Sequence, residues 1–91
     1  MSLDVADFRL LRLFMSIVEA GGFAAAQGEL NLSLSTISAH VSKLEARLGV
    51  RLCRRGRSGF ALTDEGRVIY DEARRLIGQV EHFEGRVRGL R

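Results

Sequence analysis

A stripe of apolar residues in the last third of the chain constrains the fold more than any other feature. Thr63 precedes the stripe as an N-cap, and Asp64 and Glu65 suit the positive end of a helix dipole. The sequence therefore predicts one long helix that runs from Thr63 towards Gly89. The apolar residues recur with the spacing 4-3-4-3-4-3, a heptad repeat, and are Ile69, Ala73, Leu76, Val80, Phe83, Val87 and Leu90.

So long a stripe needs a second apolar surface to cover it. A chain of 91 residues forms one domain with a modest core, which leaves little apolar surface for this purpose. The stripe is covered either by the rest of the same chain or by the same helix of a second copy. We favour the second copy and predict a two-helix dimer interface, whose residues are Ile69, Ala73, Leu76, Val80, Phe83 and Val87.

Shorter helices are predicted before this one. Asp7 is expected to cap the first, which runs to about Ala20 and ends at Gly21-Gly22. A short alanine-rich helix follows from about Phe23 to Leu30. The inner stripe of the first helix recurs at three- to four-residue spacing and contains Phe8, Leu11, Phe14 and Val18.

A third helix is predicted after the tight connection Asn31-Leu32-Ser33 and ends at Leu48, before Gly49. Ser33 is expected to act as its cap. Two helices joined in this way form a helix-turn-helix, although ordinary helical bundles contain similar corners. The buried face is predicted to hold Ile37, Val41, Leu44 and Leu48, and the opposite face Ser35, Thr36, Ser38, Ala39, His40, Ser42 and Lys43.

Residues 50–62 are predicted to form a β-hairpin with the glycine-rich turn Gly56-Arg57-Ser58-Gly59. A basic hairpin directly after a candidate recognition helix is typical of the wing of a winged helix-turn-helix, whose arginines reach phosphates or a minor groove. The basic cluster favours a polyanionic partner, and the alternative is a solvated loop. Between Ala46 and Thr63 there is no acid, and the arginines are Arg47, Arg51, Arg54, Arg55 and Arg57.

Other protein classes are disfavoured. The apolar content of 46% and charged content of 27% are those of an ordinary globular domain. A membrane span needs about 18 consecutive apolar residues, and no apolar run in the sequence is nearly that long. No signal-peptide pattern opens the chain. Cys53 is the single cysteine, so no internal disulfide is possible, which fits a reducing cytoplasm. His82 has no metal-ligand partners at suitable spacing. We therefore expect a cytoplasmic protein with no cofactor, no metal and no enzymatic activity.

Four motifs stand in a recognisable order: GGF before the second helix, STIS…KLEARLGVRL through the third, LCRRGRSGFALTDEG across the hairpin and EARRL in the last helix. With these motifs the chain resembles the N-terminal DNA-binding domain of LysR-type transcriptional regulators. The resemblance is most specific between Leu44 and Gly66. Within this stretch Cys53 occupies a position that is usually apolar in the family, which implies core packing rather than redox sensing. The resemblance implies a mainly α fold, with a winged helix-turn-helix of three helices and a β-hairpin in residues 1–62 and a long linker and dimerisation helix in residues 63–91.

The resemblance also implies a function. The chain is expected to bind double-stranded DNA at an interrupted palindrome, as a homodimer held through the linker helix, and to be the DNA-reading part of a bacterial regulator. The family usually carries a C-terminal effector-binding domain, so a small-molecule effector would act through a domain that is missing here. The alternatives are a dimeric protein-interaction module and a nucleic-acid binder without sequence preference.

The DNA contacts are expected on the third helix and the hairpin. Ser35, Thr36 and Ala39 are placed to face base edges, and Lys43 to meet phosphate. His40 either contacts DNA or is solvated, and Arg54 is expected to be solvated. The family motif adds Ser38, together with Arg55 as its recurrent wing arginine. The full predicted set is Ser35, Thr36, Ser38, Ala39, His40, Lys43, Arg55 and Arg57.

Two departures from the family pattern affect this set. Leu34-Ser35 stands where the family usually has Gln-Pro, and Ala39 stands where a basic residue usually follows the matched Ser38. Each departure removes a hydrogen-bonding or charged group. We therefore expect binding to depend more on the arginines of the hairpin and on serine and threonine contacts.

Overall fold

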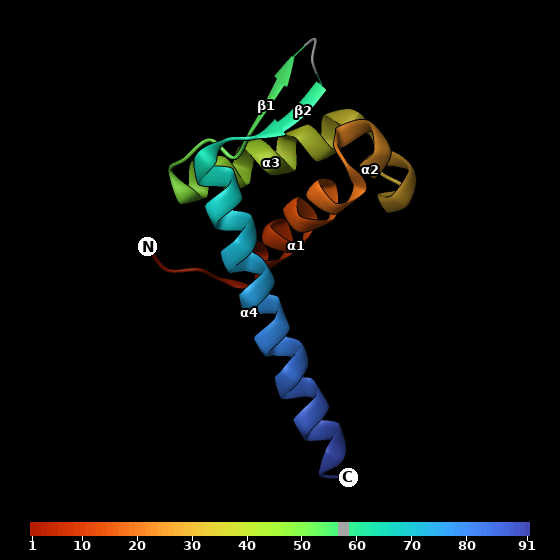
Figure 1. Ribbon diagram of the computed structural model, residues 1–91, viewed down its shortest axis with the longest axis vertical. Helices are drawn as coiled ribbons and strands as arrows, with labels where there is room; N and C mark the ends of the chain where they lie inside the picture. Colours follow the sequence, from red (N-terminus) through yellow and green to blue (C-terminus); the bar gives the residue numbers. More distant parts are fainter. Residues whose placement is uncertain (57–58) are drawn as a thin grey trace.

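The computed structural model describes residues 1–56 and 59–91, without the side chains of residues 55, 56 and 59. The fold is mainly α, as predicted, with three helices, a small β-hairpin and a long C-terminal helix (Figure 1). The elements are α1 (Val5–Ala20), α2 (Phe23–Leu30), α3 (Leu34–Leu48), β1 (Cys53–Gly56), β2 (Gly59–Leu62) and α4 (Asp64–Gly89).

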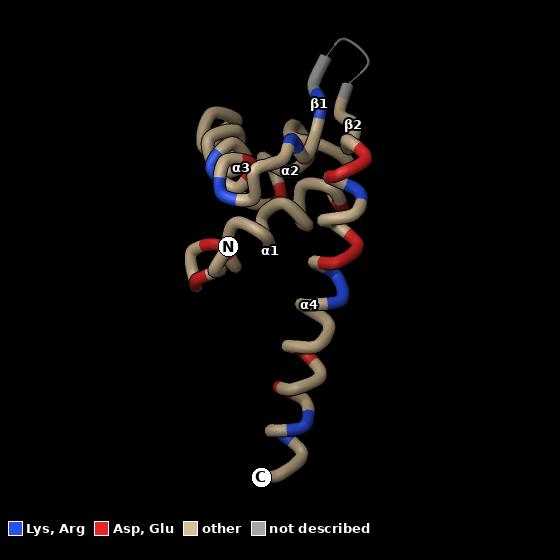
Figure 2. The backbone as a smooth tube through the Cα atoms, turned by 90° about the vertical axis from the view of Figure 1, so that its left-hand side faces the viewer, with Lys and Arg blue, Asp and Glu red and all other residues tan. Residues whose placement is uncertain are grey.

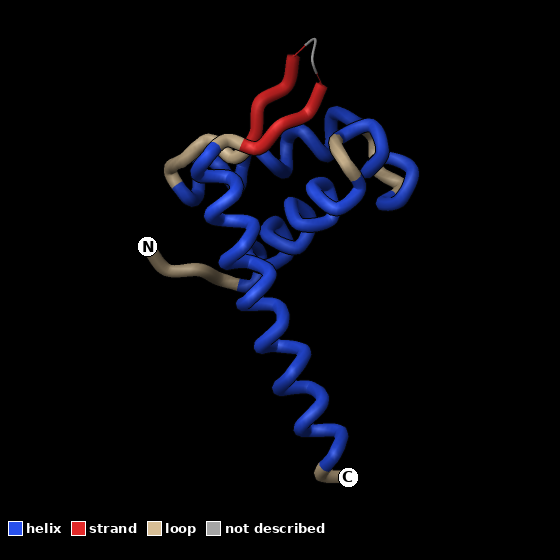
Figure 3. The backbone as a smooth tube through the Cα atoms, in the orientation of Figure 1, coloured by secondary structure: helices blue, strands red, loops and turns tan. Residues whose placement is uncertain are grey.

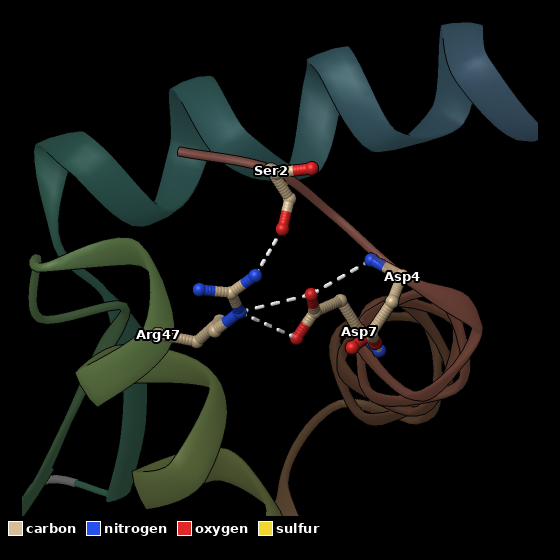
Figure 4. A network of polar contacts seen from close by, with 4 residues as sticks. All are labelled: Ser2, Asp4, Asp7 and Arg47. Carbon is tan, nitrogen blue, oxygen red and sulfur yellow. Dashed lines mark hydrogen bonds and ion pairs between the residues drawn. The ribbon is translucent and has the colours of Figure 1, made fainter.

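The start of α1 corrects the sequence prediction. Asp4, rather than Asp7, is the N-cap: its side chain accepts a hydrogen bond from the Asp7 amide at 3.0 Å, and the Asp7 carboxylate accepts from the Asp4 amide at 2.9 Å. This reciprocal pair is a capping box. Asp7 is buried, and Arg47 of α3 donates to both of its carboxylate oxygens, at 2.9 and 3.1 Å (Figure 4). Asp7 therefore joins α1 to α3 instead of opening the helix.

The helix-turn-helix follows the prediction closely. Helix α2 ends at Leu30, and the capping residue that follows, Asn31, adopts a left-handed conformation with φ of 54°. Ser33 caps α3, because its hydroxyl accepts from the Thr36 amide at 3.2 Å. Gly49 ends α3 with φ of 77°, a conformation that glycine adopts readily.

The core lies around α1, which packs against α2, α3 and α4. Leu11 and Phe14 are buried as predicted, but the sequence analysis missed Leu10 and Ile17, while Phe8 and Val18 are half-buried. One apolar cluster contains Leu10, Leu11, Phe14, Leu44, Leu52 and Ala73. The other contains Ile17, Phe23, Ala26, Ile37, Val41 and Cys53, so the predicted core position of Cys53 is confirmed.

Helix α4 is joined tightly to the base of the hairpin. The Thr63 hydroxyl accepts from the Gly66 amide at 2.9 Å, which confirms Thr63 as the N-cap, and donates to the Arg51 carbonyl at 2.6 Å. The Thr63 amide donates to the carbonyl of Leu52 at 3.1 Å, and the Leu52 amide donates to Glu45 of α3 at 2.7 Å. These bonds fix where α4 begins relative to α3 and β1.

The hairpin and the outer half of α4 leave the helical bundle on opposite sides (Figure 3). Ile69 and Ala73 pack within the single chain, and Ala73 is only 2% exposed. Ala73 therefore has almost no surface to offer to a second chain, and Ile69 is already half-buried in the same core. Further along α4, Phe83 is 67% exposed. Among the described residues, no helix is long and apolar enough to cross a membrane.

Candidate nucleic-acid interface

The outward face of α3 carries the predicted base-reading residues. Ile37, Val41 and Leu44 are buried on its inner face, which turns the opposite face to solvent. The structure brings the six predicted α3 residues together on this surface. Ser35, Ala39 and Lys43 are exposed, and Thr36, Ser38 and His40 are half-buried.

Three hydroxyl groups at the start of α3 are hydrogen-bonded to one another. The Ser33 hydroxyl donates to the Thr36 hydroxyl oxygen at 2.8 Å, and the Ser33 and Ser35 oxygens lie 3.2 Å apart. Sequence reasoning identified Ser33 as the cap but missed that it contacts two candidate base readers. It also left out Leu34, which lies at the first position of α3 and is 45% exposed.

The hairpin contacts the helix-turn-helix through Cys53 of β1, which lies in the core, and through an aromatic pair. The Phe60 ring on β2 packs against Phe23 of α2, with centroids 5.7 Å apart and planes tilted by 50°. Gly22 allows this approach, since a Cβ there would lie 3.1 Å from the Cβ of Phe60. Strands β1 and β2 are antiparallel, with Arg54 opposite Ala61. Of the predicted wing contacts, the Arg55 side chain and Arg57 lie outside the described residues.

Basic residues continue from the end of α3 into β1 (Figure 2). They are not equivalent. Arg47 is held by Asp7 and by the Ser2 carbonyl, so it has a structural partner (Figure 4). The Arg51 side chain is 78% exposed although its Nε lies 3.7 Å from a Glu45 oxygen. Lys43 and Arg54 are exposed, which leaves them available to phosphates.

The electrostatics of the pair formed by Asp7 and Arg47 are consistent with a structural role. The pKa of the Asp7 carboxyl lies below its ordinary value, because the Asp4 amide and then the Arg47 guanidinium stabilise the carboxylate, although burial opposes the effect. Within the part of the chain that the structure describes, no three His, Cys, Asp or Glu side chains gather into a metal site.

Known proteins are similar to this chain in sequence and in fold. Residues 8–67 match the family described as bacterial regulatory helix-turn-helix protein, lysR family. The HTH-type transcriptional activator BauR of Pseudomonas aeruginosa is 55% identical over 84 residues, which are 92% of this chain and 28% of that protein. The activator AaeR of Escherichia coli is 41% identical over 71 residues, 78% of this chain and 23% of that protein. The chain thus spans about a quarter of the length of these relatives.

Two solved structures are similar to this chain in fold and in sequence. The chain resembles the DNA-binding domain in the crystal structure of a CbnR DBD–DNA complex, with a TM-score of 0.81 and 36% identity, over 91% of this chain and 95% of that one. It also resembles the domain in a BenM DBD/benA site 1 DNA complex, with a TM-score of 0.83 and 29% identity, over 91% and 93% of the two chains. Both similar domains were crystallised with DNA.

Proposed function

This chain belongs to the lysR family of bacterial regulatory helix-turn-helix proteins, and from that membership we propose that it binds specific duplex DNA as a homodimer. It is a DNA-binding domain of a LysR-type transcriptional regulator. The family consists of regulators rather than enzymes, which confirms the expectation that the chain has no enzymatic activity. Sequence specificity and the dimer are the two parts of the proposal.

The observation that carries the proposal is the exposed face of α3. Ser35, Thr36 and Ala39 lie on it, opposite a buried apolar stripe, and similar domains have been crystallised with DNA. Small side chains let a helix lie close to base edges in the major groove, but each forms fewer bonds than a bidentate Arg or Gln contact. Discrimination is therefore expected at the low end of about 1–3 kcal/mol per base pair.

The contacts that position the domain are proposed to surround these readers. Ser38 and Lys43 on α3 bind phosphate, and His40 contacts the backbone or a base beside them. Arg55 and Arg57 of the hairpin bind phosphates or enter the adjacent minor groove, a proposal that rests on the sequence because their side chains are outside the described part. Phosphate contacts of this kind make affinity depend on salt without adding sequence preference.

The dimer is proposed to form through the outer half of α4. Large apolar side chains there are exposed in the single chain, Phe83 at 67% and Val87 at 38%. An exposed apolar stripe with heptad spacing is the surface that a second helix of the same kind covers. Since Ala73 is buried and Ile69 packs in the core, the proposed interface narrows to Leu76, Val80, Phe83 and Val87.

The proposal includes four further predictions. Residues 1–62 form the DNA-reading unit and residues 63–91 the dimerisation helix, although the first turns of α4 also complete the core. The target is an interrupted palindrome, because a symmetric dimer presents two equivalent reading heads. The protein acts in the cytoplasm, and any small-molecule effector acts through a C-terminal domain of a longer protein.

The decisive experiment selects bound sites from a random duplex pool and then competes single-base variants against the selected site. Ser35→Ala and Thr36→Ala are expected to relax preference at one or two symmetric positions each and to leave the salt dependence unchanged. Ser38→Ala is expected to weaken binding to every sequence alike.

Ser16→Ala is the matched control, because Ser16 lies on α1 and its hydroxyl donates only locally, to the Arg12 carbonyl. If the Ser35 and Thr36 variants keep every wild-type base preference, reading by these hydroxyls is refuted. A chain that binds scrambled competitor as tightly as the selected site is a non-specific binder, and one that binds no duplex is a protein-interaction module.

A further inference from the structure

The direction of the hydrogen bonds at the start of α3 is determined by counting hydrogens. A serine hydroxyl has one hydrogen and two acceptor positions. Ser33 donates its hydrogen to the Thr36 hydroxyl oxygen at 2.8 Å. At the 3.2 Å contact between the Ser33 and Ser35 oxygens, the hydrogen must therefore come from Ser35.

The acceptor positions agree with this order. The Ser33 oxygen also accepts from the Thr36 amide at 3.2 Å, so with the Ser35 hydrogen both of its acceptor positions are occupied. The three groups form a directed hydroxyl chain, in which Ser35 donates to Ser33 and Ser33 donates to Thr36. Hydrogen bonds in such chains polarise one another, which favours one direction over mixed arrangements.

The hydroxyl chain leaves different groups for a ligand at its two ends. The Ser35 hydrogen points to Ser33, so the exposed Ser35 oxygen presents its lone pairs. The Thr36 oxygen receives the Ser33 hydrogen, and its own hydrogen has no acceptor among the residues that the structure describes. One end is an acceptor and the other is a donor.

We infer that the hydroxyl chain sets which base edges α3 reads, with Ser35 accepting a hydrogen bond from an exocyclic amino group and Thr36 donating one to a base acceptor. In the major groove the amino groups are adenine N6 and cytosine N4, and the acceptors are purine N7, guanine O6 and thymine O4. Ser33 is then a positioning residue that touches no base. The inference rests on the proposed function, because it assumes that this face of α3 meets the major groove.

The experiment uses the duplex selected by the wild-type chain, with base analogues at the positions assigned to Ser35 and Thr36 by their alanine variants. At the Ser35 position, purine replaces adenine, or 2-pyrimidinone replaces cytosine, which removes the amino group. At the Thr36 position, a 7-deazapurine removes N7, or 4-thiothymine weakens the acceptor. Each replacement is expected to reduce wild-type affinity about five-fold, the effect of one hydrogen bond.

Ser33→Asp separates capping from hydrogen-bond direction. A carboxylate caps the helix as a serine does, but it has no hydrogen to give. The Thr36 hydroxyl then donates to the new carboxylate and presents lone pairs outward, while Ser35 still donates inward. We call the loss of affinity caused by a base analogue the analogue penalty. The variant is therefore expected to lose this penalty at the Thr36 position and to keep it at the Ser35 position. For each variant the affinity for the analogue duplex is divided by the affinity for the unmodified duplex, because the added negative charge weakens binding to every duplex.

Ser33→Gly provides an uncharged second variant, since glycine is tolerated at the cap position and frees both hydroxyls. Each freed hydroxyl can rotate to donate or to accept, so the loss of affinity caused by each analogue is expected to be smaller than for the wild-type chain. If Ser33→Asp keeps both penalties at wild-type ratios, the hydroxyl chain does not set the reading, whatever the alanine variants show. If Ser35→Ala and Thr36→Ala themselves leave every base preference unchanged, the proposed reading by α3 fails and this inference fails with it.

Discussion

Gly66 is the position where one methyl group is expected to disturb the fold most. It lies in the first turn of α4 and is buried against the backbone of Leu52. A Cβ built on Gly66 would lie 1.9 Å from the Leu52 carbonyl oxygen and 2.8 Å from the carbonyl carbon. Leu52 has little freedom to move away, because its carbonyl accepts from Thr63 and its amide donates to Glu45.

The expected magnitude for Gly66→Ala follows from three contributions. Overpacking costs about 1–3 kcal/mol, and loss of the bond from Thr63 to Leu52 costs about 1 kcal/mol more. Alanine in place of glycine inside a helix returns about 0.5–1 kcal/mol. The free energy of unfolding is therefore expected to fall by about 1–3.5 kcal/mol. Each kcal/mol lowers the melting temperature of a domain of this size by about 4–8 °C.

The matched control is Gly78→Ala, on the same helix. A Cβ there has no neighbour within 4 Å, so the helix propensity acts alone and the variant is expected to gain about 0.5–1 kcal/mol. Urea denaturation followed by circular dichroism measures both variants, at one protein concentration because the proposed dimerisation makes apparent stability depend on concentration. If Gly66→Ala is as stable as Gly78→Ala, the close approach of α4 to Leu52 is not a constraint on the fold.

Three other predictions concern charge. The folded chain lowers the pKa of the Asp7 carboxyl, so the carboxylate contributes stability above its ordinary pKa, and this stability is lost as pH falls through the lowered value. Asp7→Asn is expected to remove that acid dependence in unfolding midpoints measured across pH, and an unchanged slope contradicts the assignment. Arg55→Ala and Arg57→Ala are each expected to weaken all duplex binding and reduce the log–log salt slope by about one, and an unaltered slope in both excludes the wing from the interface. Phe83→Glu is expected to give the mass of one chain in analytical ultracentrifugation, because a charge in an apolar interface is unfavourable. The control His82→Glu, on another side of α4, is expected to stay dimeric. If Phe83→Glu is dimeric, the interface lies elsewhere.

The sequence predicts elements best where their boundaries depend on neighbouring residues. Ser33, Gly49 and Thr63 act within one helical turn, and the structure confirms all three. The start of α1 is ambiguous in the sequence, because Asp4 and Asp7 stand three residues apart and either fits a cap. What distinguishes them is the bond from Arg47 to Asp7, which joins residues forty positions apart.

Helix α4 shows a second limit of sequence periodicity. Its apolar residues follow one heptad pattern, but they divide between two surroundings. Ala73 faces the core together with Ile77, which the heptad pattern omits, whereas Phe83 is exposed. Periodicity identifies the apolar side of a helix, but it does not say which neighbour covers each part of that side.

The same distinction applies to the candidate site. The residues on the outer face of α3 could be predicted, because Ile37 and Val41 fix which side is buried. The roles of single side chains could not be predicted in the same way. Arg47 belongs to the basic run in the sequence, yet in the fold it is paired with Asp7. The order of the hydroxyl chain depends on distances between side chains that no residue pattern specifies.

A single residue, Thr63, separates β2 from α4, and its amide and hydroxyl are both bonded to the base of the hairpin. In the proposed dimer, the segment that pairs two chains is therefore continuous with the segment that orients each helix-turn-helix. If the pairing of two helices shifts by one residue, the contact moves by about 1.5 Å along the helix and by about 100° around it. Two helix-turn-helix units joined to their α4 helices in this way cannot adjust their separation independently of how the two α4 helices pair. The distance between the two half-sites of the DNA target is thus expected to be tolerated within a narrow range, set by the contact between the two α4 helices rather than by any residue that touches DNA.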